Sequence, residues 1–93
     1  MVVGAGRVGL RKVMGLLEAG AVVTVISPEW VGGFEGLPVN AVKRPFRPSD
    51  LEGAYLAFAA TNRREVNHRV AREAQKRRAP AVAHRVHLLG RRS

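Results

Sequence analysis

The chain has 93 residues, of which 46% are hydrophobic and 25% are charged, and it contains no cysteine. This length fits one small domain, and the lack of cysteine excludes disulfide bonds, thiolate catalysis and cysteine-ligated zinc. No secretory signal and no apolar run near the ~20 residues of a membrane helix are evident, so we expect a cytoplasmic protein without a membrane partner. The formal net charge of +9 favours an anionic partner: nucleic acid, a phosphate-bearing ligand or a polycarboxylate.

The first element is a short apolar run that leads into G-x-G-x-x-G at Gly4, Gly6 and Gly9. In a strand-turn-helix unit, these glycines permit a tight turn, the approach of a pyrophosphate to the backbone, and close packing of the helix, respectively. With Arg7 and Val8 at the start of the helix, where free N–H groups face an anion, they are predicted to bind the pyrophosphate of a dinucleotide. The alternative is a tight turn that binds nothing.

A helix over residues 7–19 and a strand over residues 21–26 follow this turn. Gly20 ends the predicted helix, because glycine tolerates the left-handed backbone that a helix C-terminus often needs. The strand is apolar and rich in β-branched residues, as in a parallel sheet buried on both faces. The buried face of the helix is predicted from its spacing to consist of Leu10, Val13, Met14 and Leu17.

Ser27, Pro28 and Glu29 end the second strand, where dinucleotide-binding folds place the residue that reads the adenosine ribose. The Glu29 carboxylate suits both ribose hydroxyls of NAD and would repel the 2′-phosphate of NADP, whereas Ser27 alone would tolerate either. The sequence therefore favours NAD as the cofactor. The alternative for Glu29 is an exposed loop charge.

The middle of the chain reads as a crossover followed by two further strands. Residues 30–38 are an irregular crossover or short helix, and residues 39–44 are the third strand. Ser49 and Glu52 have the spacing of a capping box, which predicts one helical turn closed by Gly53. The fourth strand covers residues 54–60.

Thr61 and Asn62 follow the fourth strand, at the edge of a parallel sheet where ligands bind. They are predicted to hydrogen-bond the nicotinamide ribose, to cap the next helix, or to do both. Asn62 and Glu65 form a second capping-box pattern, which predicts that a helix begins here. Its buried face is predicted to consist of Val66, Val70, Ala71 and Ala74.

The predicted fold is α/β: a three-layer, Rossmann-like parallel sheet with strand order 3-2-1-4-5 and the ligand crevice between strands 1 and 4. Its fifth strand, over residues 81–83, is weak. We assign residues 1–83 to an NAD-binding domain and residues 84–93 to a basic tail without a clear period. His84 and His87 lie in this tail, three residues apart. They could bind a metal, or His84 could act as a proton acceptor, but exposed side chains are favoured because no third ligand is near, so we predict no metal site and no catalytic residue. The uncovered sheet edge makes a homodimer plausible.

Four stretches together resemble one family: VVGAGRVGLRKVMGLLEAGA, VTVISPE, VKRPFRPSDLEGAYLAFAATN and EVNHRVAREA. Over roughly residues 2–79 they are similar to the N-terminal domain of siroheme synthase, the precorrin-2 dehydrogenase family. The resemblance implies an NAD-binding domain that oxidises the tetrapyrrole precorrin-2 to sirohydrochlorin by hydride transfer. It also implies that the glycines hold the pyrophosphate, Ser27 and Glu29 the adenosine, and Thr61 and Asn62 the nicotinamide.

The chain departs from the family near its C-terminal end. The family's fifth strand leads to a catalytic aspartate, whereas here no Asp or Glu follows Glu73. The family's dimerisation region and helical domain are also missing, so we expect a truncated or frame-shifted reading from about Arg77 and leave enzymatic activity open. The alternatives are a non-catalytic nucleotide-binding regulatory module and, less favoured because the arginine-rich region has no aromatic residue for stacking, a nucleic-acid-binding protein.

Overall fold

The computed structural model describes residues 1–54 and 56–77. Within them, four parallel strands form a sheet in the order β3-β2-β1-β4. The strands are β1 (Val2–Ala5), β2 (Thr24–Trp30), β3 (Asn40–Val42) and β4 (Phe58–Ala59). The α/β fold and the predicted order of its first four strands are confirmed. The predicted fifth strand at residues 81–83 and the tail at residues 84–93 lie outside the described residues.

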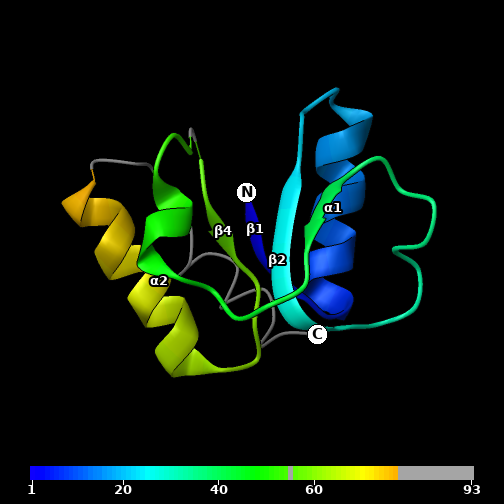
Figure 1. The fold of residues 1–93 in the computed structure, drawn as a ribbon. Helices are drawn as coiled ribbons and strands as arrows, with labels where there is room; N and C mark the ends of the chain where they lie inside the picture. The colour runs from blue at the N-terminus through cyan, green and yellow to red at the C-terminus, as the bar shows by residue number, and fades with distance from the viewer. Residues whose placement is uncertain (55, 78–93) are drawn as a thin grey trace.

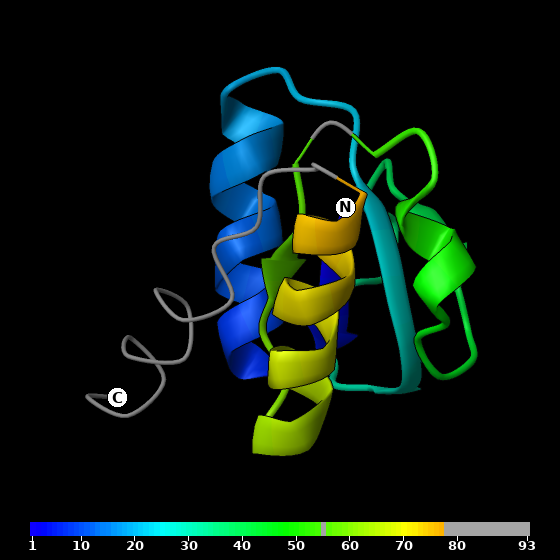
Figure 2. The same ribbon diagram turned by 90° about the vertical axis from the view of Figure 1, so that its left-hand side faces the viewer.

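Helices cover both faces of this sheet and make three layers (Figure 1). Helix α1 (Arg7–Glu18) lies on one face, and helix α2 (Arg64–Lys76) lies on the other. A short 3-10 helix, η1 (Pro48–Leu51), lies beside α2 (Figure 2). No helix within residues 1–54 and 56–77 combines the length and the apolar character needed to cross a bilayer.

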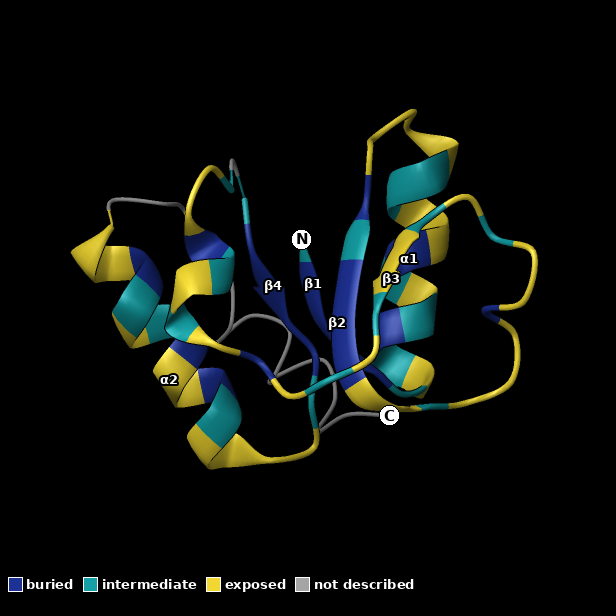
Figure 3. Cartoon of the chain, viewed as in Figure 1, coloured by how far each residue is buried: buried dark blue, intermediate teal, exposed yellow. Residues whose placement is uncertain are grey.

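Strand β1 contributes to both hydrophobic cores, which is why it is buried along its whole length (Figure 3). Val2 packs in the core under α1, and Val3 packs with Leu51 and Val70 in the core under α2. Ala5 belongs to the α1 side, although strict alternation would place it with Val3. The alternation breaks because the intervening residue is Gly4, whose φ is +115°.

Helix α1 ends at Glu18, one residue before the predicted end, and Gly20 takes the left-handed conformation that was predicted for it. Gly20 has a φ of +81°. The N–H of Gly20 donates to the carbonyl of Leu17 at 3.0 Å, and the N–H of Ala21 donates to the carbonyl of Leu16 at 3.0 Å. This pair of bonds is the Schellman motif, which satisfies carbonyl groups at the helix end.

The predicted buried face of α1 is wrong at one position. Val13 is fully buried and Leu10 and Leu17 pack against the core, but Met14 is 47% exposed. Gly9 is buried instead, because it is the residue at which the helix touches β1. At about 100° per residue, this contact turns the buried face of α1 away from Met14.

Strand β2 runs through the residues that were predicted to end it. The pairing of β1 with β2 shifts from Val3 opposite Ile26 to Ala5 opposite Trp30, so β2 carries extra residues at this point. Pro28 lies in this bulge, where a residue without an N–H group is tolerated. Residues 27–29 are therefore a bulge inside β2 rather than a loop beyond it.

Strands β3 and β4 are shorter than predicted. The length of β4 is limited by its pairing with β1, which consists of Val2 opposite Phe58 and Val3 opposite Ala59. Beyond them, the N–H of Ala60 donates to the carbonyl of Val3 at 2.8 Å. The crossover at residues 31–39 is irregular and contains no helix.

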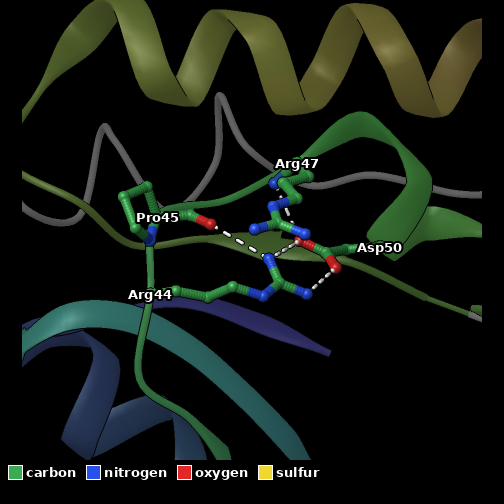
Figure 4. Close-up of polar contacts among 4 residues, drawn as sticks. All are labelled: Arg44, Pro45, Arg47 and Asp50. Atoms are coloured by element: carbon green, nitrogen blue, oxygen red, sulfur yellow. Dashed lines mark hydrogen bonds and ion pairs between the residues drawn. The ribbon is translucent and has the colours of Figure 1, made fainter.

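An arginine-aspartate pair fixes the connection between β3 and η1 (Figure 4). The Arg44 guanidinium donates to both carboxylate oxygens of Asp50, and the N–H of Arg47 donates to Oδ2 of Asp50 at 2.7 Å. The hydrogen bond from Arg44 holds the pKa of Asp50 below its usual value. The predicted capping box of Ser49 and Glu52 is wrong, since Asp50 takes that role and η1 begins one residue before Ser49.

Candidate functional site

Three groups of predicted site residues lie at one edge of the sheet, because the carboxyl ends of parallel strands point the same way. They are the glycine turn after β1, the bulge at residues 27–29 in β2, and Thr61 with Asn62 after β4. Strand β1 lies between β2 and β4. From β1 the chain continues to β2 and β3 on one side of β1, and then crosses to β4 on its other side. The boundary between β1 and β4 is therefore the topological switch point, where open α/β sheets bind ligands.

Gly4 brings β1 and β4 together at this switch point. A Cβ atom on Gly4 would lie 2.8 Å from both the carbonyl carbon and the oxygen of Ala60, and 3.0 Å from Cγ2 of Thr61. Its φ of +115° is also strained for any residue with a side chain. Gly4 therefore permits both the turn and the contact with β4.

Gly9 and Gly6 serve opposite needs in the same turn. A Cβ on Gly9 would lie 2.2 Å from the carbonyl oxygen of Gly4, so only glycine lets α1 pack this closely on β1. Among the described residues, a Cβ on Gly6 would meet no atom within 4 Å. The backbone of Gly6 is therefore open, as the predicted approach of a pyrophosphate requires.

The first N–H groups of α1 are available to a ligand. The first helical bond runs from Leu10 to the carbonyl of Gly6 at 2.9 Å. The N–H groups of Arg7, Val8 and Gly9 precede it, and none has a hydrogen-bond partner among residues 1–54 and 56–77. The first turn contains no acidic residue, and Arg7 is exposed. Free donors at the positive end of a helix dipole suit an anion.

The bulge in β2 holds the backbone of Glu29 in place. The Ser27 hydroxyl donates to the carbonyl of Glu29 at 2.7 Å, and Nε1 of Trp30 donates to the carbonyl of Ser27 at 2.8 Å. The Trp30 ring packs edge-on against Phe34, with 4.9 Å between the ring centroids. Ser27 is 7% exposed and thus acts on the backbone beside it, whereas the Glu29 side chain is exposed to solvent.

The loop after this bulge packs back onto α1. Gly33 has a φ of +114°, and a Cβ at this position would lie 2.6 Å from Cδ2 of Leu10. The N–H of Gly33 donates to Oε2 of Glu35 at 2.8 Å. Hydrogen bonds from the backbone of Glu35 and of Gly33 lower the pKa of the Glu35 carboxyl.

The turn after β4 is held by side chains. The hydroxyl of Thr61 accepts a hydrogen bond from the N–H of Arg63 at 3.2 Å, and it donates to Oδ1 of Asn67 at 2.7 Å. Asn62 is exposed and does not cap α2, whose N-cap is Arg63 without a side-chain cap. The predicted capping box of Asn62 and Glu65 is therefore wrong.

Asn67 on α2 also holds this turn, and the sequence did not predict that role. It is 3% exposed and lies on the buried face of α2, between the predicted core residues Val66 and Val70. A polar residue inside an otherwise apolar helix face was the signal that could have identified it, because buried polar groups need hydrogen-bond partners. Of the face that was predicted, Val70 and Ala74 are buried and Val66 and Ala71 pack against the core.

A comparison with protein families decides the kind of site. A family model described as NAD(P)-binding matches residues 1–87. The chain belongs to this NAD(P)-binding family. The N–H groups at the start of α1 and the exposed Glu29 thus occur in an NAD(P)-binding domain, and the class of cofactor predicted from the sequence is confirmed.

Siroheme synthases and a precorrin-2 dehydrogenase are among the proteins to which this NAD(P)-binding domain is similar. The siroheme synthase of Methylobacillus flagellatus is 45% identical over 85 residues, which cover 86% of this chain and 18% of that protein. The siroheme synthase of Photobacterium profundum is 43% identical over 81 residues, or 83% of this chain and 17% of that protein. The solved structure of SirC, precorrin-2 dehydrogenase, matches with a TM-score of 0.70 at 27% identity, and the match covers 75% of this chain and 37% of SirC.

These findings confirm the family resemblance drawn from the sequence. The chain spans less than a fifth of the length of these siroheme synthases. Over the matched part, SirC shares the fold of this chain.

Proposed function

We propose that the chain binds NAD at the switch point between β1 and β4 and forms the cofactor-binding part of a precorrin-2 dehydrogenase. The glycine turn is the observation that carries this proposal, because it leaves an open backbone at Gly6 beside three N–H groups that have no partner in the part of the chain that the structure describes. The proposed reaction, the oxidation of precorrin-2, is inferred from the similarity of the chain to siroheme synthases and to a precorrin-2 dehydrogenase. Bound NAD would accept the hydride that precorrin-2 loses on oxidation.

The pyrophosphate would bind at the start of α1. In this proposal the N–H groups of Arg7, Val8 and Gly9 donate to its oxygens, and the helix dipole favours the negative charge. Gly4 supports the site indirectly by allowing the turn, and Gly6 leaves space for the ligand. The absence of an acidic residue from the first turn of α1 avoids repulsion of the phosphates.

The adenosine and nicotinamide ends would lie on either side of this turn. The exposed Glu29 would accept the ribose hydroxyls of NAD and repel the 2′-phosphate of NADP, while buried Ser27 holds the backbone of Glu29 in place. On the β4 side, Thr61 and Asn62 would face the nicotinamide ribose. We therefore propose NAD rather than NADP as the preferred cofactor.

One observation favours a second candidate function, a nucleotide-binding module without turnover. No Asp or Glu follows Glu73, so the chain itself supplies no carboxylate in the region where the family resemblance implies the catalytic aspartate. A module of this kind would bind NAD without a tetrapyrrole. Binding of both NAD and precorrin-2 by the cytoplasmic protein would favour the dehydrogenase.

The test is a calorimetric titration of the chain with NAD and with NADP, together with the variants Gly6→Asp and Gly15→Asp. Gly6 is the N-cap of α1 and Gly15 lies within α1, and a Cβ on either meets no atom within 4 Å in residues 1–54 and 56–77. Aspartate is a preferred N-cap residue, so Gly6→Asp should fold while its carboxylate repels the pyrophosphate. Gly15→Asp adds the same charge away from the glycine turn.

We expect saturable binding of NAD, weaker binding of NADP, and a loss of NAD affinity of at least about a hundredfold in Gly6→Asp. Gly15→Asp should bind NAD within a few-fold of the unchanged chain. Equal affinity of the two variants for NAD, or no binding by the folded unchanged chain, would contradict the proposed function.

A further inference from the structure

Asn67 is a buried polar side chain that forms three hydrogen bonds with Thr61 of the site. It lies on the second turn of α2, and its side chain is almost wholly shielded from solvent. Every hydrogen bond of the Asn67 side chain within residues 1–54 and 56–77 joins it to Thr61.

The bonds hold both backbone groups of Thr61 at once. Oδ1 of Asn67 accepts from the N–H of Thr61 at 3.2 Å and from its hydroxyl at 2.7 Å. Nδ2 of Asn67 donates to the carbonyl of Thr61 at 2.9 Å. The amide thus pairs with the backbone of Thr61 as a strand would, and it fixes the direction in which the chain leaves β4.

Thr61 lies directly against the glycine turn. Its Cγ2 atom is 3.0 Å from the position of a Cβ on Gly4, so the two turns touch across the switch point. A displacement of Thr61 would change the boundary between β1 and β4 without touching the first turn of α1. A displacement of Thr61 would therefore change the binding of the nicotinamide half of a dinucleotide more than the binding of the adenosine half.

We propose that Asn67 is a positioning residue for the cofactor, which holds Thr61 and the turn after β4 in the shape that the nicotinamide half of NAD requires. This inference rests on the proposed function. It assigns to Asn67 no contact with the cofactor, since its side chain is already committed to Thr61. Among the described residues the Asn67 side chain makes no hydrogen bond to α1 or β2, so we expect the pyrophosphate and adenosine subsites to keep their shape when Asn67 is replaced.

The experiment compares NAD with ADP, which has the adenosine and the pyrophosphate but no nicotinamide half. Calorimetric titrations with both ligands are made on the unchanged chain, on Asn67→Asp and on Asn67→Ser. The aspartate keeps the acceptor for the Thr61 N–H but puts an oxygen against the Thr61 carbonyl, and the serine is too short to reach both backbone groups. Gln75→Glu is the matched control, because it makes the same amide-to-carboxylate change at an exposed position of α2.

In the Asn67 variants we expect NAD affinity to fall by about tenfold or more, while ADP affinity stays within about twofold of the unchanged chain. Gln75→Glu should change neither. Equal losses for NAD and ADP would show that Asn67 only stabilises the fold, and unchanged NAD affinity would show that Thr61 needs no support; either result overturns the inference. If Asn67→Asp fails to fold, Asn67→Ser decides between these outcomes. Absence of NAD and ADP binding by the unchanged chain would instead refute the proposed function.

Discussion

The turn after β1 and the turn after β4 both lead from a buried strand into a helix, but they differ in whether their backbone N–H groups are hydrogen-bonded. After β1, the N–H groups of Arg7, Val8 and Gly9 have no hydrogen-bond partner among the described residues. After β4, the N–H groups of Thr61 and Arg63 both donate to side-chain oxygens. The first turn is open to a ligand, and the second is closed by its own side chains.

This difference separates binding from positioning at the switch point. The shape of the glycine turn requires residues without a side chain, because a Cβ added at Gly4 or Gly9 would collide with the backbone. The turn after β4 gains its shape from side chains that are present, above all Asn67. A ligand that occupies both turns would meet donors on one side and a surface of fixed shape on the other.

The largest expected effect breaks the first turn. In Gly9→Ala the new Cβ, which is fixed to the backbone of α1, would lie 2.2 Å from the carbonyl oxygen of Gly4 in the packed backbone after β1. Because neither can move freely, we expect α1 to shift away from β1 and the free energy of unfolding to fall by about 2–4 kcal/mol. Urea denaturation followed by circular dichroism would measure this loss.

Gly15→Ala is the control for this substitution. Gly15 lies on the same helix, and a Cβ at this position meets no atom within 4 Å. Because alanine favours a helix more than glycine does, this variant should gain up to about 1 kcal/mol. Equal stability of the two variants would refute the close contact between α1 and β1.

An intermediate effect is expected at Asp50, which supports the α2 side of the sheet without belonging to either turn. Its carboxylate side chain is 8% exposed and binds Arg44 through two hydrogen bonds. Asp50→Asn replaces this ion pair by weaker bonds, so we expect a loss of about 1.5–2 kcal/mol at neutral pH. NAD affinity should change little, because Asp50 contacts neither turn.

The loss at Asp50 should depend on pH with a definite sign. The bond from Arg44 lowers the pKa of Asp50 from its usual 3.8 in the folded chain. The stabilisation is therefore complete above about pH 4 and disappears as the pH falls through the lowered pKa. Urea denaturation at several pH values should show the unchanged chain and Asp50→Asn converging in acid, whereas exposed Glu52→Gln should match the unchanged chain throughout. A pH-independent difference at Asp50 would contradict the ion pair.

The first turn could be predicted from the sequence because its causes are local. The spacing of Gly4, Gly6 and Gly9 after β-branched residues fixes a turn in which two Cβ atoms have no room and the third is free. The strand order of the sheet follows from the same local units, since each short connection restricts where the next strand can pair. The stereochemical roles of Gly4 and Gly9 were therefore accessible without a structure.

The second turn and the bulge could not be predicted in this way. Asn62 and Glu65 have the spacing of a capping box, but the hydrogen bonds of Thr61 reach Asn67, six residues along the chain. Such a bond depends on how α2 packs under β4, which no local pattern contains. The bulge at residues 27–29 likewise depends on the pairing of β2 with β1 beyond Gly4.

The smallest expected effect sharpens the difference between the two turns. Thr61→Val keeps the shape of the side chain but removes the hydroxyl, which bonds to Oδ1 of Asn67 at 2.7 Å and to the N–H of Arg63. Asn67 retains its two bonds to the Thr61 backbone, so we expect a loss of only about 1 kcal/mol in the free energy of unfolding. Thr61→Ser keeps the hydroxyl and should recover most of this difference in the same urea denaturation. If the valine variant were as stable as the serine variant, the backbone bonds of Asn67 alone would close this turn, and the hydroxyl of Thr61 would be free to serve the cofactor.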